Sequence, residues 1–119
     1  MEDKMKKIEK LVSELFIRFR APAHLKGYYC ARIGIILVVM DISLLDSITQ
    51  RLYPEINKNN SFEVVNVGRA IEHFISVIYE KGNLYELEKY FGTRQKPTNA
   101  QFIATIADRI RMGISDNLK

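Results

Sequence analysis

Apolar residues in this sequence recur at steps of three and four, and no stretch alternates apolar and polar residues for long enough to indicate a β-strand. This spacing places apolar side chains along one face of an α-helix, so the chain must form its core by packing helices together. A chain of 119 residues can bury such a core without disulfide or metal cross-links. We therefore expect an all-α protein in which residues 1–119 form a single six-helix, bundle-like domain.

Prolines and apolar patterning define the first two predicted helices. The first spans about residues 3–19, with apolar residues on one face, and Pro22 ends it. The second opens near residues 22–24 and runs to Met40. Because it is apolar on nearly all sides, we expect it to lie at the centre of the fold.

A third helix is predicted to begin at Ser43. Ser43 and Asp46 have the spacing of an N-terminal cap, and the apolar residues that follow mark a buried face. Pro54 lacks an amide hydrogen and clashes with the preceding turn, so the helix should kink or restart there. The restart leaves residues 54–58 as the short first helix of a helix-turn-helix, with polar residues 57–61 as the turn.

The fourth predicted helix is the second helix of that motif. Asn60 and Glu63 have capping-box spacing at its start, and Gly82 should end it near Lys81. Apolar residues between positions 64 and 78 fall on one face of this helix, which should pack against the core.

The opposite face of the fourth helix carries candidates for contacts with DNA bases. In a recognition helix, the early outward residues meet base edges in the major groove. Arginine can bind guanine, asparagine can pair with adenine, and valine can touch the thymine methyl group. The candidate base-reading residues are Val65, Asn66, Arg69 and His73. Glu63 and Glu72 oppose this interpretation, because phosphates repel carboxylates.

The net charge of +4 favours a polyanionic partner, but the basic residues are unevenly distributed. Residues 1–26 carry a charge of +3, residues 27–92 carry −2, and residues 93–119 carry +3. The basic excess therefore flanks the helix-turn-helix. Candidate phosphate-binding residues, chosen from position and charge, are Lys26, Arg51, Lys58, Arg94 and Lys96.

The sequence offers little support for catalysis, metal binding or membrane insertion. His24 is interpreted as a local hydrogen-bond partner at the start of a helix. His73 has no cysteine or paired carboxylate near it in the sequence, and Cys30 is the only cysteine. We therefore expect no enzyme activity, no metal and no cofactor. The longest apolar run, residues 33–40, is too short to span a membrane, and the charged N-terminus is unlike a signal peptide. These features predict a cytoplasmic protein with no membrane partner.

Several collinear segments resemble a known family, and they cover residues 22 to about 111. They are 22–28 (PAHLKGY), 44–49 (LLDSIT), 52–56 (LYPEI), 69–73 (RAIEH), 82–84 (GNL), 90–92 (YFG) and 96–104 (KPTNAQFIA). With these segments, the chain resembles the C-terminal DNA-binding domain of the sporulation stage zero master response regulator family.

That resemblance implies a six-helix domain that binds double-stranded DNA at promoters as a dimer and regulates transcription. In the family, the helix matching residues 84–91 contacts the RNA polymerase sigma subunit, which implies Leu84 and Phe91 as partner-contacting residues. The last helix, here residues 99–111, is associated with dimer contacts on DNA. The implied assemblies are a homodimer or a heterodimer with a full-length sporulation regulator.

The chain differs from the family in two respects. Residues 1–21 predict a helix in place of the receiver domain, so no phosphorylation switch is expected within this chain. The family carries serine, arginine and arginine where this chain has Val65, Asn66 and Glu72, and it carries glutamate at the position of Gly68. We therefore predict a stand-alone DNA-binding transcription regulator with altered recognition-helix specificity.

An alternative function is an interaction module that does not read DNA. Such a module would pair with and modulate a full-length sporulation regulator or RNA polymerase. Val65 on the outward face, with Glu63 and Glu72 beside it, favours this alternative. Binding to random-sequence DNA at low salt would distinguish the two functions, because phosphate contacts strengthen there.

Overall fold

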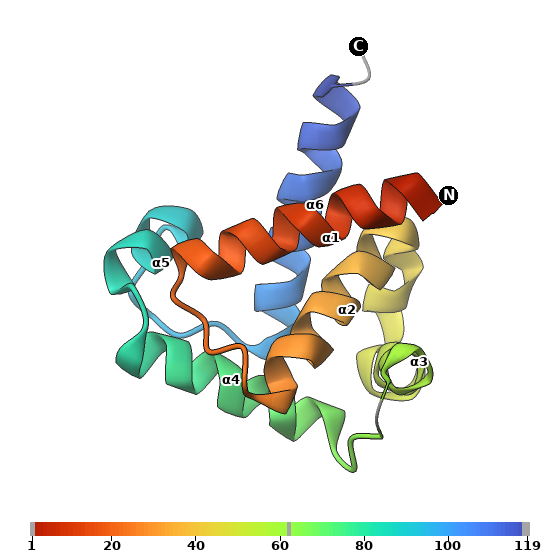
Figure 1. Cartoon of the computed structure of the whole chain (residues 1–119), viewed down its shortest axis with the longest axis horizontal. Helices are drawn as coiled ribbons and strands as arrows, with labels where there is room; N and C mark the ends of the chain where they lie inside the picture. Colours follow the sequence, from red (N-terminus) through yellow and green to blue (C-terminus); the bar gives the residue numbers. More distant parts are fainter. Residues whose placement is uncertain (1, 62, 118–119) are drawn as a thin grey trace.

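Helices form all the regular structure of residues 2–61 and 63–117, the part of the chain that the computed structural model describes, with side chains described to residue 113 (Figure 1). In chain order, the elements are α1 (Glu2–Arg18), α2 (Lys26–Met40), the 3₁₀ segment η1 (Ile42–Ser47), the π-helical segment η2 (Ile48–Leu52), α3 (Tyr53–Asn59), α4 (Val67–Lys81), α5 (Leu84–Phe91) and α6 (Asn99–Asn117). The prediction of an all-α domain with six α-helices is confirmed.

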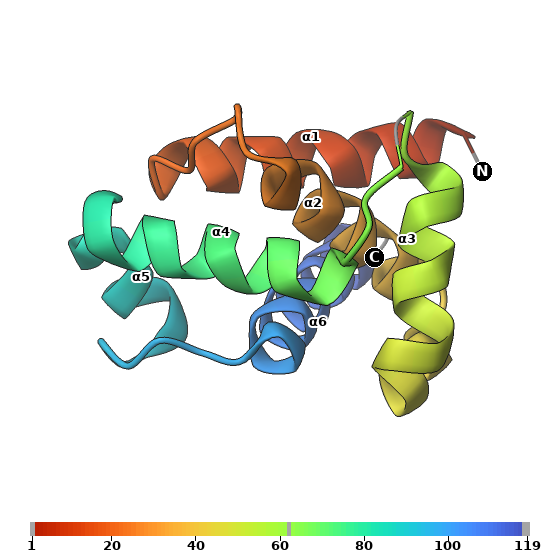
Figure 2. The ribbon, with the colours of Figure 1, turned by 90° about the horizontal axis from the view of Figure 1, so that it is seen from below.

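Helix α2 lies at the centre of the fold, as predicted. It contacts α1, α3, α4 and α6, and it buries residues on nearly all sides (Figures 1 and 2). Gly27 allows its first turn to press against α4, because an added Cβ atom would lie 2.1 Å from the Ala70 carbonyl oxygen. The helix begins at Lys26 and not at residues 22–24, since Leu25 keeps an extended backbone as the N-cap residue.

An aromatic cluster fixes the inner face of α4 to three other helices. The ring of Phe74 lies 5.3 Å from that of Phe16 on α1 and 6.2 Å from that of Phe102 on α6. Phe91 of α5 stacks on Phe102 with ring centroids 5.5 Å apart. Truncating a buried phenylalanine to alanine usually costs about 3 to 5 kcal/mol. This cluster therefore holds α4 firmly, with its opposite face toward solvent.

In the segment between α2 and α3, the predicted N-terminal cap is not formed, whereas the predicted restart of the helix at Pro54 is. Asp41 caps η1, and its carboxylate accepts hydrogen bonds from the Ser43 backbone N–H at 3.1 Å and the Ser43 hydroxyl at 2.6 Å. The predicted cap by Ser43 and Asp46 is wrong, because Asp41 supplies the acceptor. The predicted restart at Pro54 is confirmed: α3 begins at Tyr53, and a proline in the first turn loses no helical hydrogen bond.

Helix α4 begins later than predicted. Asn66 is its N-cap residue, and the Asn60–Glu63 capping box is wrong. The reason is a tertiary pair: Asn57 donates to the Val64 carbonyl at 2.8 Å and accepts from the Val64 N–H at 2.9 Å. These bonds hold buried Val64 in the connection before α4 and prevent the helix from starting at Asn60.

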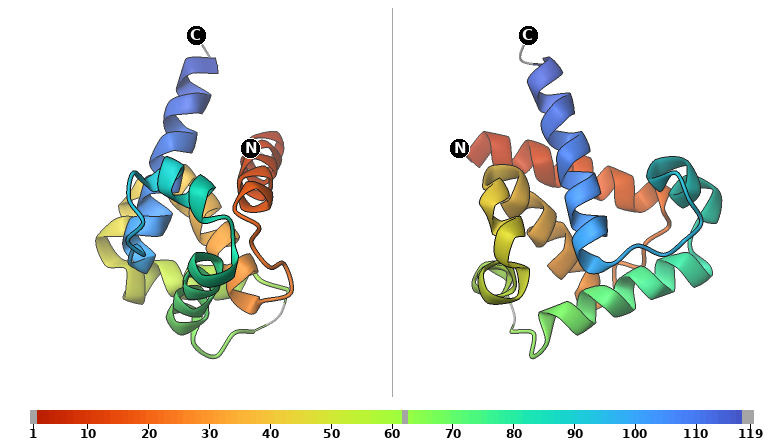
Figure 3. Two further views of the ribbon diagram at one scale, coloured as in Figure 1. Left: turned by 90° about the vertical axis from the view of Figure 1, so that its left-hand side faces the viewer. Right: turned by 180° about the vertical axis from the view of Figure 1, so that it is seen from behind.

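The last two helices agree with the ranges that the family resemblance implied, with one extension. Helix α5 has the expected bounds, and α6 continues from the expected residue 111 to Asn117. Its end projects past α1, away from the body of the domain (Figures 1 and 3). No helix in the described ranges is both long and apolar enough to cross a membrane.

Candidate nucleic-acid interface

Helix α4 is amphipathic and presents a polar face to solvent. Val67, Ile71, Phe74, Ile75 and Ile78 form its buried face. On the other face, Arg69, Glu72 and His73 are exposed. Figure 2 shows α4 along one side of the molecule with α3 steeply inclined to it at its N-terminal end. This pair of helices has the arrangement of a helix-turn-helix, with α4 in the place of the recognition helix.

Two of the four predicted base-reading residues precede α4. Val65 is fully exposed in the connection, and the Asn66 side-chain oxygen accepts a hydrogen bond from the Arg69 backbone N–H at 3.0 Å. The prediction that both residues lie within the helix is wrong, because α4 starts at Val67. Asn66 is therefore a capping residue, and its amide nitrogen and the second lone pair of its oxygen are left to approach a base.

Arg69 and His73 remain together on the outer face of α4. They lie one turn apart, about 6 Å along the helix axis. Neither side chain forms a hydrogen bond or an ion pair with the described residues. The guanidinium group of Arg69 is thus available to an external acceptor near the start of the helix.

Gly68 allows an aromatic ring to pack onto the start of α4. An added Cβ atom would lie 2.8 Å from the Tyr53 ring. The Asn99 side-chain amide donates to the Tyr53 hydroxyl at 3.1 Å and to the Gly68 carbonyl at 2.8 Å. Helices α3, α4 and α6 therefore meet at Gly68. This close contact explains why a glycine is present inside a helix, where it normally lowers helix stability.

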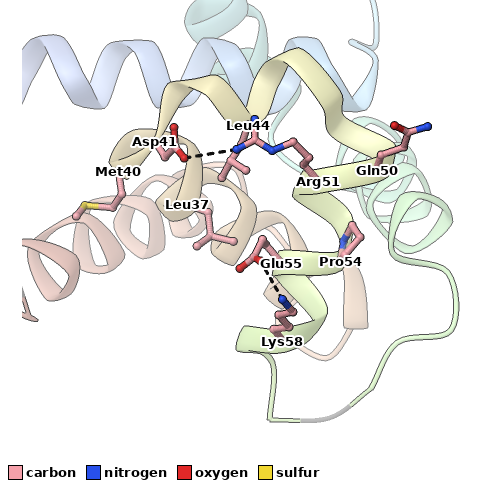
Figure 4. A pocket seen from close by; sticks show the side chains of 9 residues that line it. All are labelled: Leu37, Met40, Asp41, Leu44, Gln50, Arg51, Pro54, Glu55 and Lys58. Carbon is pink, nitrogen blue, oxygen red and sulfur yellow. Dashed lines mark hydrogen bonds and ion pairs between the residues drawn. The ribbon is translucent and has the colours of Figure 1, made fainter.

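Two predicted phosphate-binding residues lie in a groove where carboxylates accompany them. The groove is a cavity of about 450 Å³ lined by α2, η1, η2 and α3 (Figure 4). Arg51 lies 3.9 Å from the Asp41 carboxylate, and Lys58 lies 3.3 Å from that of Glu55. The hydrogen bonds from Ser43, with a smaller contribution from Arg51, hold the pKa of Asp41 below its ordinary value. Asp41 therefore stays ionised and offsets the charge of Arg51.

The other three predicted phosphate-binding residues differ in their surroundings. Arg94 is bonded to the Glu88 carboxylate, and Lys96 donates to the Ser76 hydroxyl at 2.9 Å. Lys26, the first residue of α2, is exposed and makes no hydrogen bond or ion pair with its side chain in the described part of the chain. The structure thus does not gather these five residues at one site.

A second cavity brings together basic residues that the sequence did not connect. It has a volume of about 340 Å³ and lies between α4 and the connection from α1 to α2. We call four of its lining residues the cationic cluster: Arg20, His24, His73 and Lys81. The two histidines are far apart in sequence, so only the packing of this connection on α4 could reveal the cluster.

The predicted partner-contacting residues on α5 are partly covered. Leu84 and Phe91 are half-buried, and Phe91 also packs near Phe19, with ring centroids 6.0 Å apart. Tyr85, which was not predicted, is the exposed large hydrophobic side chain of α5, at 72%. A partner that approaches α5 would meet Tyr85 before either predicted residue.

Histidine, cysteine and acidic side chains are the residues that could bind a metal ion. Within the described residues, no group of three or more histidine, cysteine or acidic side chains is placed to hold a metal ion. Cys30 is a buried free thiol, and desolvation raises its pKa. A thiol in this environment is a poor nucleophile.

A comparison with known protein families gives a match over most of the chain. The family model described as "Sporulation initiation factor Spo0A C terminal" matches residues 12–110. The matched region runs from within α1 to within α6, and it contains α3, α4 and the connection between them.

Proposed function

The chain belongs to the sporulation initiation factor Spo0A C-terminal family, and from this premise we propose that α4 reads double-stranded DNA through a surface centred on Arg69. The family supplies the general function, that of a DNA-binding domain of a sporulation regulator. The residues that contact bases, the altered specificity and the partners are proposals that rest on the geometry described above.

The observation that carries this proposal is the position of Arg69. Its side chain is exposed in the first turn of α4, and it has no acidic partner among the described residues. An arginine at this place can form two hydrogen bonds with guanine in the major groove. His73, one turn further, is the second candidate on the same face.

Altered specificity follows from the residues around Arg69. Val65 and Asn66 stand where the family carries serine and arginine, and Glu72 replaces a second arginine. Each good bidentate base contact contributes about 1 to 3 kcal/mol of discrimination, so losing two removes most of the family's preference. Val65 can instead contact a thymine methyl group from the connection before α4.

Fluorescence anisotropy with a random-sequence duplex tests DNA binding by the whole chain. Arg69→Ala should weaken binding by about 5- to 150-fold on the best sequence selected from a random library, the range expected for one base contact. Lys10→Ala is the matched control, because it removes one exposed positive charge from α1. Undetectable binding of the unchanged chain at low salt would contradict the proposal, since phosphate contacts strengthen there.

Two variants of Asn66 separate its capping function from base recognition. Asn66→Ser keeps an N-cap acceptor for the Arg69 N–H, whereas Asn66→Ala removes it and should lower stability by about 1 kcal/mol. If the Asn66 amide pairs with adenine, Asn66→Ser should relax the selected sequence at one position while leaving the unfolding midpoint unchanged. An identical selected sequence for both proteins would assign Asn66 to capping alone.

Partner binding is the second candidate function, and exposed apolar side chains favour it. Val65 is fully exposed, Tyr85 projects from α5, and Met112 is 60% exposed on the projecting end of α6. We propose that α6 supports a homodimer or a heterodimer with a full-length sporulation regulator, and that α5 meets the polymerase sigma subunit. Co-elution with each purified protein tests this, and no association at tens of micromolar concentration would count against it.

A further inference from the structure

We propose that the cationic cluster of Arg20, His24, His73 and Lys81 is a phosphate-binding site that holds the DNA backbone beside α4. This inference rests on the proposed function, because it assigns a second contact to the same DNA complex. It also reassigns His73 from a contact with DNA bases to a contact with the DNA phosphate backbone. None of the five phosphate-binding residues expected from the sequence belongs to this site.

The cluster joins two cations, Arg20 and Lys81, and two imidazoles, His24 and His73, from three places in the chain. Arg20 follows α1, His24 precedes α2, and His73 and Lys81 come from α4. No aspartate or glutamate of the described chain lines the cavity. Glu72 and Glu80 are exposed on α4 but lie outside the lining. The two cations and the absence of a lining carboxylate among the described residues therefore suit a phosphate group.

Tight backbone contacts hold the connection on α4. The Asn83 N–H donates to the Phe19 carbonyl at 2.9 Å, which fixes the end of α1 beside the end of α4. At the other end of the connection, Gly27 packs directly against Ala70 of α4. Arg20 and His24 are thus placed by the folded backbone and need little rearrangement to meet an anion.

Arg20 has a backbone conformation that favours glycine. Its φ angle is +57°, and it is the only residue other than glycine with positive φ in the described part of the chain. It occupies the C′ position of a Schellman motif at the end of α1, where the Ala21 N–H donates to the Phe16 carbonyl at 2.9 Å. Glycine fits this position without steric cost, so an arginine here points to a use for its side chain.

The cluster is also free to bind. None of its four side chains forms a hydrogen bond or an ion pair with the described residues. Leu25, which lines the same cavity, caps α2 without a side-chain acceptor, so the first amides of α2 lack a side-chain partner. The positive end of the α2 dipole adds to the attraction for an anion.

The spacing from Arg69 fits a backbone contact. Arg69 and Lys81 are about 18 Å apart along α4, with His73 about 6 Å from Arg69. The major groove is about 12 Å wide, so when Arg69 reads bases the far end of α4 lies over the flanking phosphates. The cluster occupies that part of the helix, together with the adjoining connection.

Anisotropy titrations of the full chain with random-sequence duplex at several salt concentrations test the site. Arg20→Gly and Lys81→Gln should each reduce affinity about eightfold at 0.1 M salt, and each should reduce the slope of log affinity against log salt by about 0.9. The loss should be the same on every sequence, because phosphates carry no sequence information. Lys10→Ala removes an equal charge from α1 and should bind like the unchanged chain.

Three results decide the inference. If the unchanged chain binds duplex and both cluster variants match Lys10→Ala, the site is wrong while DNA binding stands. If the unchanged chain binds no duplex, the proposed function fails, and NMR titration with inorganic phosphate then tests the site alone. Shifts confined to Arg20, His24, His73 and Lys81 would support a site for free phosphate, and absent shifts would overturn it.

Discussion

Two parts of this molecule gather basic side chains, and the two differ in whether carboxylates lie beside those side chains. In the groove between α2 and α3, Arg51 and Lys58 each lie beside a carboxylate, from Asp41 and Glu55. On the outer side of α4, Arg69 and the cationic cluster have no acidic partner among the described residues. The basic side chains on the α4 side are therefore available to an external anion, whereas Arg51 and Lys58 are already offset by carboxylates.

The largest expected effect is on stability, at Gly27. This glycine lets α2 pack directly on α4, and that packing helps to place Arg20 and His24 beside α4. In Gly27→Ala, the new Cβ atom would lie 2.1 Å from the Ala70 carbonyl oxygen and 2.6 Å from Phe74 Cβ. Such overpacking against backbone should destabilise the domain by about 3 kcal/mol. Urea unfolding measures this change.

Gly113→Ala is the control for that substitution. Nothing lies within 4 Å of a Cβ atom at Gly113, so alanine in this part of α6 should be neutral or stabilise by up to about 1 kcal/mol. If both variants unfold at the same urea concentration, the close packing of α2 on α4 is not present in solution.

A substitution of Asn57 tests the connection between α3 and α4. We expect a smaller loss of stability than for Gly27→Ala. Asn57→Ala removes both hydrogen bonds to Val64 and leaves a buried N–H and a buried carbonyl without a partner. The free energy of unfolding should fall by about 2 kcal/mol. Asn59→Ala, which removes a bond at the exposed Glu55 carbonyl, should change it by less than about 0.5 kcal/mol. If both variants lost the same free energy of unfolding, the conclusion that Asn57 holds Val64 in place would be contradicted.

Arg20 should show opposite effects on stability and on DNA affinity. Arg20→Gly places glycine in a left-handed conformation and should stabilise the fold by about 1 kcal/mol, measured by thermal unfolding. Arg20→Ala removes the same charge but keeps the unfavourable φ angle, so it should not stabilise. A gain in stability for both variants would trace the effect to charge and not to the backbone.

Removing the carboxylate beside Arg51 should give the smallest effect, a change in DNA affinity. It tests the difference between the two regions most directly, because it makes a paired cation available. Asp41→Asn keeps an acceptor for the Ser43 N–H but removes the charge beside Arg51. Affinity for random duplex should rise about threefold, below the eightfold of a full phosphate contact, because Arg51 still donates to the Ser43 carbonyl. Asp3→Asn on α1 makes the same change in net charge and should have less effect. A larger rise for Asp3→Asn would show that net charge decides binding.

The sequence predicted those features that local chemistry determines. The apolar face of α4 and the restart at Pro54 follow from residue spacing and from proline geometry, and both are confirmed. The start of α4 was not predictable in this way. Asn60 and Asn66 have similar capping chemistry, and the hydrogen bonds between Asn57 and Val64, seven residues apart, decide between them.

The candidate site was predictable only in part, for a related reason. Arg69 and His73 were found because a helix places residues four apart on one face. The convergence of His24 with His73 depends on the tertiary contact of α2 with α4, which no local pattern encodes. Arg20 gave no signal, since the sequence does not reveal a positive φ angle at an arginine.

The side-chain amide of Asn99 connects three helices through two hydrogen bonds. It holds the Tyr53 hydroxyl of α3 and the Gly68 carbonyl of α4 at the root of α6, the helix whose far end extends beyond the body. A molecule that binds the far end of α6 therefore contacts a helix that is hydrogen-bonded to both α3 and α4. If such binding changed the affinity for DNA, linkage would require DNA to change the affinity for that molecule by the same factor.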